Sequence, residues 1–132
     1  MPTKRMSRRR KAKTVALGED VVEAIIPMVP IVRAASGSSL TVEVDIENPS
    51  VNYTVGFDDT TLMYCRVDRR ETVAGLSPGT HRLVWSFSHL EKDWKHVIAA
   101  QVAGQPAVTL EERSEAKKDA PYSIGLALVV IE

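Results

Sequence analysis

Hydrophobic and polar residues alternate along the chain between positions 40 and 57. Over Leu40–Glu47 every second residue is aliphatic, and the residues between them are polar or acidic. Over Val51–Phe57 the apolar residues again recur at every second position, after the turn pair Asn48-Pro49. Because successive side chains of a β-strand point to opposite faces of a sheet, both segments predict strands with one buried face.

Further extended segments follow as far as the C-terminus. We expect strands over Thr61–Val67, His81–Phe87, Trp94–Val102, Ala107–Leu110 and Tyr122–Ile131. The last of these is apolar at almost every position, so we expect a central strand that is covered on both faces. Between the strands we expect a connection over Thr72–Gly79 and a charged excursion with a helical turn over Glu111–Asp119.

The N-terminal part adds one extended segment, Val21–Val32. Its two prolines, Pro27 and Pro30, each remove a ladder donor, which places it at a sheet edge or on a crossing between sheets. In all, the pattern predicts about seven or eight strands of an all-β, antiparallel β-sandwich, Ig/fibronectin-like or jelly-roll-like. We expect two parts: a basic, flexible arm over residues 1–18, which is disordered alone, and one sandwich domain over residues 19–132.

One short motif supports a sandwich. In Ser77-Pro78-Gly79, proline and glycine suit the two central positions of a type II turn. The surrounding Leu76–Thr80 resembles the Leu-x-Pro-Gly-Thr corner of fibronectin type III domains. The tyrosine that usually follows this corner is absent here, and Arg82 and Leu83 lie in its neighbourhood. The resemblance therefore implies a sandwich corner and does not extend to membership of that family.

Charge is divided unevenly along the chain. Residues 1–14 contain seven basic residues and no acidic one: Lys4, Arg5, Arg8, Arg9, Arg10, Lys11 and Lys13. The formal net charge of the whole chain is zero, so residues 15–132 carry the compensating excess of acidic charge. A basic arm on an acidic body is typical of a charged interaction tail.

We therefore expect the arm to contact nucleic acid or an acidic partner. The arm has no aromatic residue on which a base could stack, so any binding to nucleic acid is expected to be independent of sequence. A solubilising tail and a targeting peptide are the alternatives. The sequence contains neither a secretory apolar region after the basic residues nor an apolar stretch of about 20 residues, so we expect no membrane span and an intracellular or particle-bound location.

His89, Asp93 and His96 raise the question of a metal site. On a helix they would share one face, with Glu91 nearby, and histidine with carboxylate binds zinc. However, the segment lies between two predicted strands, and the tight spacing of a His-Glu-x-x-His motif is missing. We predict a polar loop rather than a metal site.

Candidate catalytic groups are sparse. Cys65, the single cysteine, cannot form an intrachain disulfide, and in mid-strand a thiol usually packs as a small hydrophobe. The acid pairs Asp58-Asp59 and Glu111-Glu112 are of a kind that is usually solvated. Neither a Gly-x-Ser-x-Gly elbow nor a glycine-rich phosphate loop is present. We predict a protein without catalytic, cofactor-binding or metal-binding residues.

Two functional hypotheses follow. The first is a non-enzymatic structural or assembly protein, of the virion or particle-subunit type, that forms a homo-oligomer or packs with other structural subunits. The second is a ligand-binding or adhesion module for a carbohydrate or protein. His89, Trp94, His96 and the Glu111–Asp119 loop would form its surface, because an exposed tryptophan beside polar groups can stack on a sugar ring or anchor an interface. Packing of Trp94 in the core is the alternative.

Overall fold

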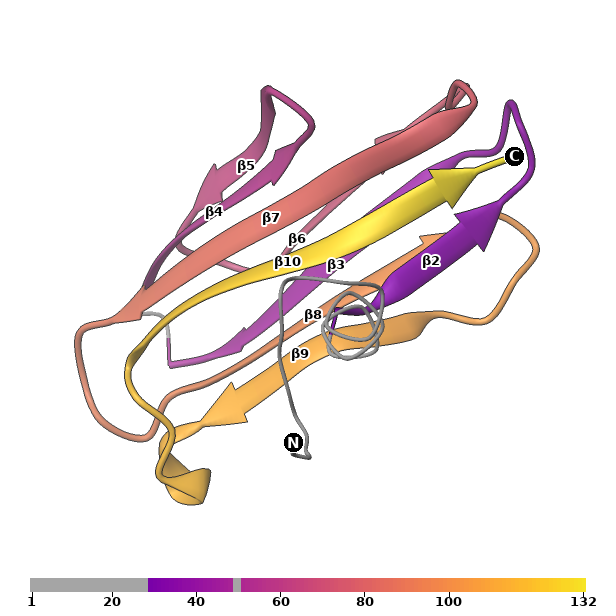
Figure 1. Ribbon diagram of the computed structural model, residues 1–132. Helices are drawn as coiled ribbons and strands as arrows, with labels where there is room; N and C mark the ends of the chain where they lie inside the picture. The colour runs from indigo at the N-terminus through magenta and orange to yellow at the C-terminus, as the bar shows by residue number, and fades with distance from the viewer. Residues whose placement is uncertain (1–28, 49–50) are drawn as a thin grey trace, which may run out of the picture. The chain divides into compact units, whose positions relative to one another are not determined.

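The computed structural model describes residues 29–48 and 51–132, and these fold almost entirely into β-strands (Figure 1). In chain order the strands are β2 (Ile31–Ala34), β3 (Leu40–Glu47), β4 (Val51–Phe57), β5 (Thr60–Cys65), β6 (Arg69–Val73), β7 (Gly79–His89), β8 (Lys95–Val102), β9 (Val108–Ser114) and β10 (Tyr122–Ile131). One 3₁₀ turn, η2 (Glu115–Lys117), lies between β9 and β10. The described part of the chain contains no α-helix, so the predicted all-β class is confirmed.

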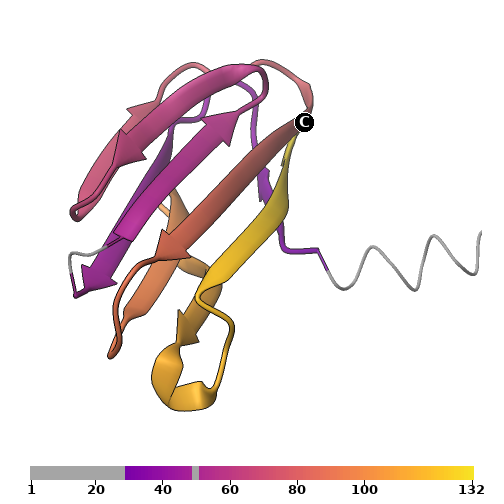
Figure 2. The ribbon, with the colours of Figure 1, turned by 90° about the vertical axis from the view of Figure 1, so that its left-hand side faces the viewer.

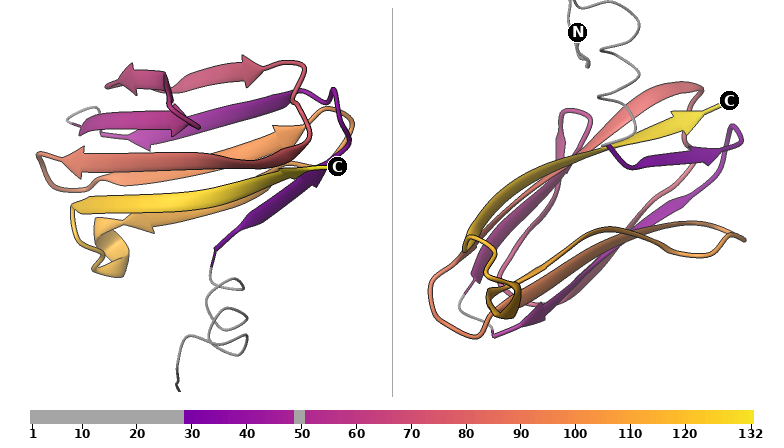
Figure 3. Two further views of the ribbon diagram at one scale, coloured as in Figure 1. Left: turned by 45° about the horizontal axis from the view of Figure 1, so that its top comes forward. Right: turned by 60° about the horizontal axis from the view of Figure 1, so that its bottom comes forward.

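The strands form two sheets that pack face to face (Figure 2; Figure 3). One sheet has the order β2-β10-β7-β4-β5, and the other has the order β6-β3-β8-β9. Neighbouring strands are antiparallel, except that β2 runs parallel to β10 at the edge of the larger sheet. Two packed, mainly antiparallel sheets confirm the predicted β-sandwich.

The alternation of β3 and β4 places their apolar side chains between the sheets. Leu40, Val42 and Val44 of β3 and Val55 of β4 are completely buried. The polar residues between them point to the other face and remain partly exposed. Each such aliphatic side chain contributes about 1.5–3 kcal/mol when it is removed from water, so the pattern seen in the sequence accounts for much of the packing.

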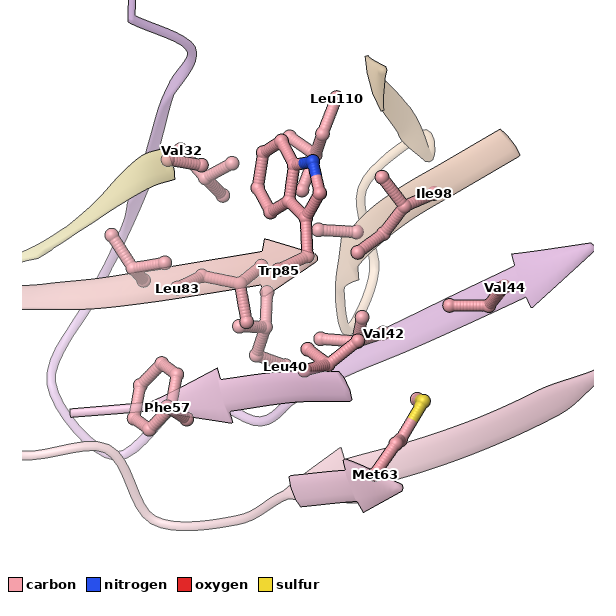
Figure 4. Packing of buried hydrophobic residues seen from close by; sticks show 14 of the residues in the cluster. Val32, Leu40, Val42, Val44, Phe57, Met63, Leu83, Trp85, Ile98 and Leu110 are labelled. Atoms are coloured by element: carbon pink, nitrogen blue, oxygen red, sulfur yellow. The ribbon is translucent and has the colours of Figure 1, made fainter. Parts of the chain in front are cut away.

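The core is continuous between the two inner faces (Figure 4). Leu83 and Trp85 of β7 reach it from the larger sheet, and Val42, Ile98 and Leu110 reach it from the smaller one. Because both sheets contribute to one core, the residues at the ends of their strands are held in fixed positions relative to one another.

Two expectations about connections are corrected. The expected connection Thr72–Gly79 begins within a strand, β6, whose sequence is largely charged and exposed because it lies at a sheet edge. The expected excursion Glu111–Asp119 begins as part of β9, which continues to Ser114, and only then forms the turn η2. In both segments backbone pairing decides the conformation, and the side chains give no alternating signal.

The expectation that β10 is covered on both faces is wrong for one face. β10 lies between β2 and β7, so it is interior to its sheet. However, Tyr122, Ile124 and Leu126 on its outer face are 60%, 69% and 38% exposed. No further layer covers this face in the described part of the chain.

The described residues include only the end of the predicted N-terminal segments. Ile31 and Val32, at the end of the predicted extended segment, lie in the edge strand β2, as expected for a segment that contains prolines. The rest of that segment up to residue 28, and the whole basic arm, lie outside the described residues. No helix among the described residues is long and apolar enough to cross a membrane.

Candidate functional site

The two histidines and the tryptophan singled out in the sequence come together at one end of the sandwich. His89 is the last residue of β7 and His96 is the second residue of β8, so they approach each other from opposite sheets. Trp94 directly precedes β8. The alternation of β7 turns Trp85, Phe87 and His89 to its buried face. Local strand geometry thus explains why both imidazoles point inward.

Stacking of aromatic rings fixes the orientation of the two imidazoles. The centroids of Phe87 and His96 are 3.7 Å apart with 6° between the ring planes. Those of His89 and Trp94 are 4.2 Å apart with 14° between the planes. The planes of the two histidines differ by only 5°, at a centroid distance of 5.1 Å. The imidazoles therefore meet edge to edge, with their nitrogens facing each other.

A chain of hydrogen bonds joins this pair to two further strands. His89 Nε2 lies 2.8 Å from His96 Nδ1, and His96 Nε2 lies 2.7 Å from Oε2 of Glu111 on β9. The hydroxyl of Ser123 on β10 donates to the same carboxylate oxygen over 3.2 Å. This histidine–glutamate chain therefore connects β7 and β10 of the larger sheet to β8 and β9 of the smaller one.

The direction of each hydrogen bond follows from the carboxylate of Glu111, because an ionised carboxylate has no proton to donate and acts only as an acceptor. With both histidines neutral, Nε2–H of His96 donates to Glu111, and Nδ1 of His96 accepts from Nε2–H of His89. The remaining nitrogen of His89, Nδ1, is then a bare acceptor. It is buried without a hydrogen-bond partner.

The surroundings shift the pKa of Glu111 downward. Burial, the largest single influence, raises this pKa, but it is outweighed by the hydrogen bond from His96, the Trp85 indole, the charge of His96 and the hydrogen bond from Ser123. The indole Nε1 of Trp85 has no hydrogen-bond partner, so the hydrogen bonds formed with the carboxylate are those of His96 and Ser123. The site therefore favours an ionised Glu111.

The surroundings act in the opposite sense on His89. Its pKa is lowered to about 4, first because burial disfavours the charged imidazolium and second because His96 lies beside it. His89 is therefore held neutral at physiological pH. The ionised carboxylate of Glu111 contacts His96 and not His89.

The cluster is not the exposed surface that the ligand-module hypothesis requires. His89, Trp94 and His96 are only 7%, 3% and 1% exposed. Of the two alternatives for Trp94, the structure has the packed one, in which the indole covers His89. The physical reason is that the interior of the sandwich extends to the end of β7, so inward residues remain buried there.

The helical spacing of His89, Asp93 and His96 is not used, because no helix forms between β7 and β8. Asp93 has an exposed side chain and a positive φ of 61°, and its backbone N–H donates to the Glu115 carboxylate. Among residues 29–48 and 51–132, no group of three or more His, Cys, Asp or Glu side chains is placed to hold a metal ion.

Glu111 and Ser123 are members of the site that the sequence did not indicate. The pair Glu111-Glu112 was expected to be solvated, and only Glu112 is, forming ion pairs with Lys95 and Lys117 at 3.5 and 3.7 Å. The register of β8 and β9 pairs Ile98 with Glu111 and the next residue with Thr109, which leaves Leu110 as the extra residue of a bulge. Glu111 thereby turns inward directly after the buried Leu110, contrary to simple alternation.

A shallow cleft of about 490 Å³ lies next to the buried cluster. It is lined by four acidic and two basic residues, with Trp94 among the others. Lys95 and Lys117 already pair with Glu112 there. Because Trp94 is only 3% exposed, the cleft offers no open aromatic face for a ligand.

A different surface stands out on the outer face of the larger sheet. We call it the apolar stripe: Tyr122, Ile124 and Leu126 of β10 with Val84 of β7, which is 39% exposed. Leu126 pairs with Val84 and Ile124 pairs with Ser86, so these side chains are immediate neighbours. Contiguous exposed apolar residues on a folded domain commonly mark an interaction site.

The seven basic residues predicted to contact a partner, Lys4, Arg5, Arg8, Arg9, Arg10, Lys11 and Lys13, lie outside the described residues. Comparison of the chain with protein-family models, with curated proteins and with solved structures finds no match.

Proposed function

We propose that this protein is a non-enzymatic assembly subunit whose sandwich packs against a second copy of the chain through the apolar stripe. The observation that carries the proposal is the exposure of Ile124, Tyr122 and Leu126 on a strand that is interior to its sheet. Each square ångström of apolar surface removed from water contributes about 25 cal/mol, so covering this stripe is favourable.

The stripe suits a second copy because it is nearly symmetric about Ile124. Tyr122 and Leu126 lie two residues to either side of Ile124 on the same face of β10. A two-fold axis at Ile124 would place Tyr122 of one copy against Leu126 of the other, which is the self-complementary arrangement of an isologous dimer.

The charges of this face also suit such a pairing. Beside the stripe, the outward residues of β7 are Ser86 and Ser88, and those of β4 include Asn52 and Thr54, all uncharged. Arg82 lies beyond the end of the stripe and pairs with Asp59 at 3.5 Å. A dimer centred on Ile124 would therefore bury no charge at its centre and would keep Arg82 at the solvated rim.

The basic arm completes the proposal. We assign its seven cations, Lys4, Arg5, Arg8, Arg9, Arg10, Lys11 and Lys13, to contact with nucleic acid or with an acidic partner. The acidic excess of the remaining chain supports this division, because it disfavours contact of a polyanion with the body. A subunit of a virion or another nucleic-acid-containing particle would combine these two properties.

We further infer that the sandwich is Ig/fibronectin-like rather than jelly-roll-like. In chain order, β4, β7 and β10 would correspond to strands C, F and G, which lie side by side in that fold, and β5 would correspond to C′. The pair β3-β6 would correspond to strands B and E. The hairpin β8-β9 would then be an insertion between F and G that extends the smaller sheet on the other side of β3.

His81 supports this interpretation of the fold. It follows the Leu76–Thr80 corner at the start of β7, where Ig-like domains place a tyrosine that bonds back to the backbone upstream. His81 Nε2 lies 2.8 Å from the Ser77 carbonyl, and its Nδ1 lies 2.7 Å from Asp58. These two acceptors, the Asp58 carboxylate first, raise the pKa of His81. The histidine would thus replace the missing tyrosine of the corner.

The assembly proposal is tested by light scattering coupled to size-exclusion chromatography. The wild-type chain is expected to run as a dimer or larger species, and Ile124→Asp is expected to shift it to the monomer. Because Ile124 is exposed, this change should leave the fold intact, which circular dichroism checks. Val108→Asp, at an exposed apolar position of the other sheet, is the matched control and should stay assembled. A monomeric wild type, or equal mass for Ile124→Asp and wild type, would refute the proposal.

The rival hypothesis of a loop-based ligand module has no comparable support. It depended on an accessible Trp94, and this indole is buried against His89.

A further inference from the structure

Independently of assembly, we propose that the histidine–glutamate chain is an acid-sensitive latch, which holds the two sheets together at this end of the sandwich and opens when the histidine pair takes up a second proton. The latch consists of His89, His96 and Glu111, and each comes from a different strand. The number of protons that this geometry can accommodate determines when the latch opens.

The neutral pair is linked by one shared hydrogen. Nε2 of His89 and Nδ1 of His96 are 2.8 Å apart, so one of these nitrogens must donate and the other must accept. The contact therefore exists only while at least one of the two facing nitrogens carries no proton.

A first added proton can be accommodated on His96. Its Nε2–H continues to donate to Glu111 at 2.7 Å, now as an ion pair, and its Nδ1–H donates to Nε2 of His89. His89 then carries its own hydrogen on Nδ1, where the structure has no partner for it. One hydrogen bond changes direction, but the link between the strands persists.

A second proton cannot be accommodated in the same geometry. Both facing nitrogens would then carry hydrogens at a separation that requires an acceptor. Two imidazolium rings would also lie with their centroids 5.1 Å apart, in a place where His89 and His96 are 7% and 1% exposed. Like charges this close and this poorly solvated repel strongly, and separating β7 from β8 relieves the repulsion.

The groups around the pair can compensate only one positive charge. From β9 the pair is faced by Glu111 and by Arg113, whose buried Nε has no partner and whose charge is paired with Asp119 at 3.9 Å. β10 contributes the hydroxyl of Ser123. The register partners of the histidines on β3 and β4 are Ile46 and Val51, which do not titrate. In the part of the chain that the structure describes, Glu111 is therefore the one anion in contact with the pair.

The acids of the adjoining loops are occupied elsewhere. Glu115 accepts the backbone N–H of Asp93, and Asp119 accepts the backbone N–H of Ser114 at 3.2 Å. The side chain of Asp93 is exposed, as is that of Glu91. The depressed pKa of His89 agrees with this accounting, because it places the second protonation well below neutral pH.

Opening would expose a specific part of the molecule. The backbone N–H of His89 donates to the Pro121 carbonyl at 2.8 Å, and that of Glu115 donates to the Trp94 carbonyl at 3.1 Å. The loops at this end are thus bonded to His89 and to Trp94, which stacks on His89. Release in acid would uncover the stacked rings of Phe87 and Trp94.

An acid titration of the full chain from about pH 7.5 to 3.5, followed by NMR and tryptophan fluorescence, tests the latch. The chain has only three histidines, so each can be assigned. We expect His81 to titrate without a change in tryptophan emission. We expect the second protonation of the histidine pair, which opens the latch, to coincide with a change in tryptophan emission. Titration of His89 near the ordinary value of 6.5, or constant tryptophan emission over the whole acid range, would overturn the proposal.

Three variants add a directional test. His89→Phe leaves one histidine, which cannot take up a second proton, and retains the stacking, so the acid transition should move to lower pH or leave the titrated range. Glu111→Gln removes the compensating anion and should move it to higher pH. His81→Gln, a histidine outside the latch, should leave it unchanged. If the first two variants keep the wild-type midpoint, the latch is wrong, and if they do not fold, the wild-type titration still decides. Oligomeric mass measured on the same samples tests the assembly proposal separately.

Discussion

Gly125 shows how much the core depends on a single absent side chain. A Cβ atom at this position would lie 2.2 Å from Cε2 and 2.3 Å from Nε1 of the Trp85 indole. Gly125 pairs with Trp85 across β10 and β7, so the ring folds over the glycine. Close approach, rather than an unusual backbone conformation, therefore requires glycine here, and it lets the large indole fill the space between the sheets.

Replacing Gly125 by alanine should therefore be costly. We expect Gly125→Ala to lower the free energy of unfolding by about 1–3 kcal/mol, the usual cost of overpacking a core, as measured by urea denaturation. Gly56→Ala is the comparison, because its Cβ would meet only a Val84 methyl group at 3.3 Å and the Thr60 carbonyl at 3.5 Å. Equal losses for the two variants would contradict the argument from the indole.

At the scale of elements, the end of β9 illustrates how a charged segment is given a definite conformation. Ser114 has an extended backbone, and its hydroxyl accepts the N–H of Lys117 at 3.3 Å, so it caps the turn η2. The Asp119 carboxylate accepts a hydrogen bond from the Ser114 N–H. Lys118 ends the turn with a positive φ of 62°. Local hydrogen bonds of this kind, rather than apolar burial, define the path from β9 to β10.

The cap gives a prediction at the scale of this element. Ser114→Ala should lower the free energy of unfolding by about 0.5–2 kcal/mol, because the buried end of β9 loses its acceptor for the Lys117 N–H. Thermal or urea denaturation measures the difference. Thr109→Ala, at an exposed position of the same strand, is the control and should change stability by no more than about 0.5 kcal/mol. A silent Ser114→Ala would show that the turn does not depend on its cap.

At the scale of the whole molecule, the distribution of charge assigns the two proposed roles to different parts of the chain. The seven cations of residues 1–14 are balanced by an acidic excess in the rest of the chain. The apolar stripe, in contrast, belongs to the sandwich and contains no charge. Binding of a polyanion and packing of subunits would therefore respond differently to salt, since screening weakens the first and leaves apolar burial in place.

This separation can be measured with duplex DNA. If all seven cations contact phosphates, the logarithm of the affinity should fall against the logarithm of salt concentration with a slope of about −6. Fluorescence anisotropy with two duplexes of unrelated sequence should give the same affinity for both. Deletion of residues 1–17 should abolish this binding without changing the number of subunits in the assembly. A slope near zero, or binding that survives the deletion, would remove the role assigned to the arm.

The sequence by itself determined the strands that alternate in hydrophobicity and the apolar side chains that these strands place in the core, but it did not reveal β6 or the full extent of β9. The alternation in Leu40–Glu47 and Val51–Phe57 is confirmed because it depends only on the two-residue period of a strand. The same period turns His89 and His96 inward. The sequence also separated the basic arm from the body by charge alone.

Tertiary structure alone decided which strands are neighbours and what covers each face. The meeting of His89 with His96 joins opposite sheets, and the inward turn of Glu111 depends on a bulge beside Leu110, so neither follows from local alternation. The exposure of the outer face of β10 could not be predicted for the same reason, because a run of apolar residues looks the same in the sequence whether or not another layer covers it. Periodicity is a property of one segment, whereas register and cover arise from contacts between segments far apart in the chain.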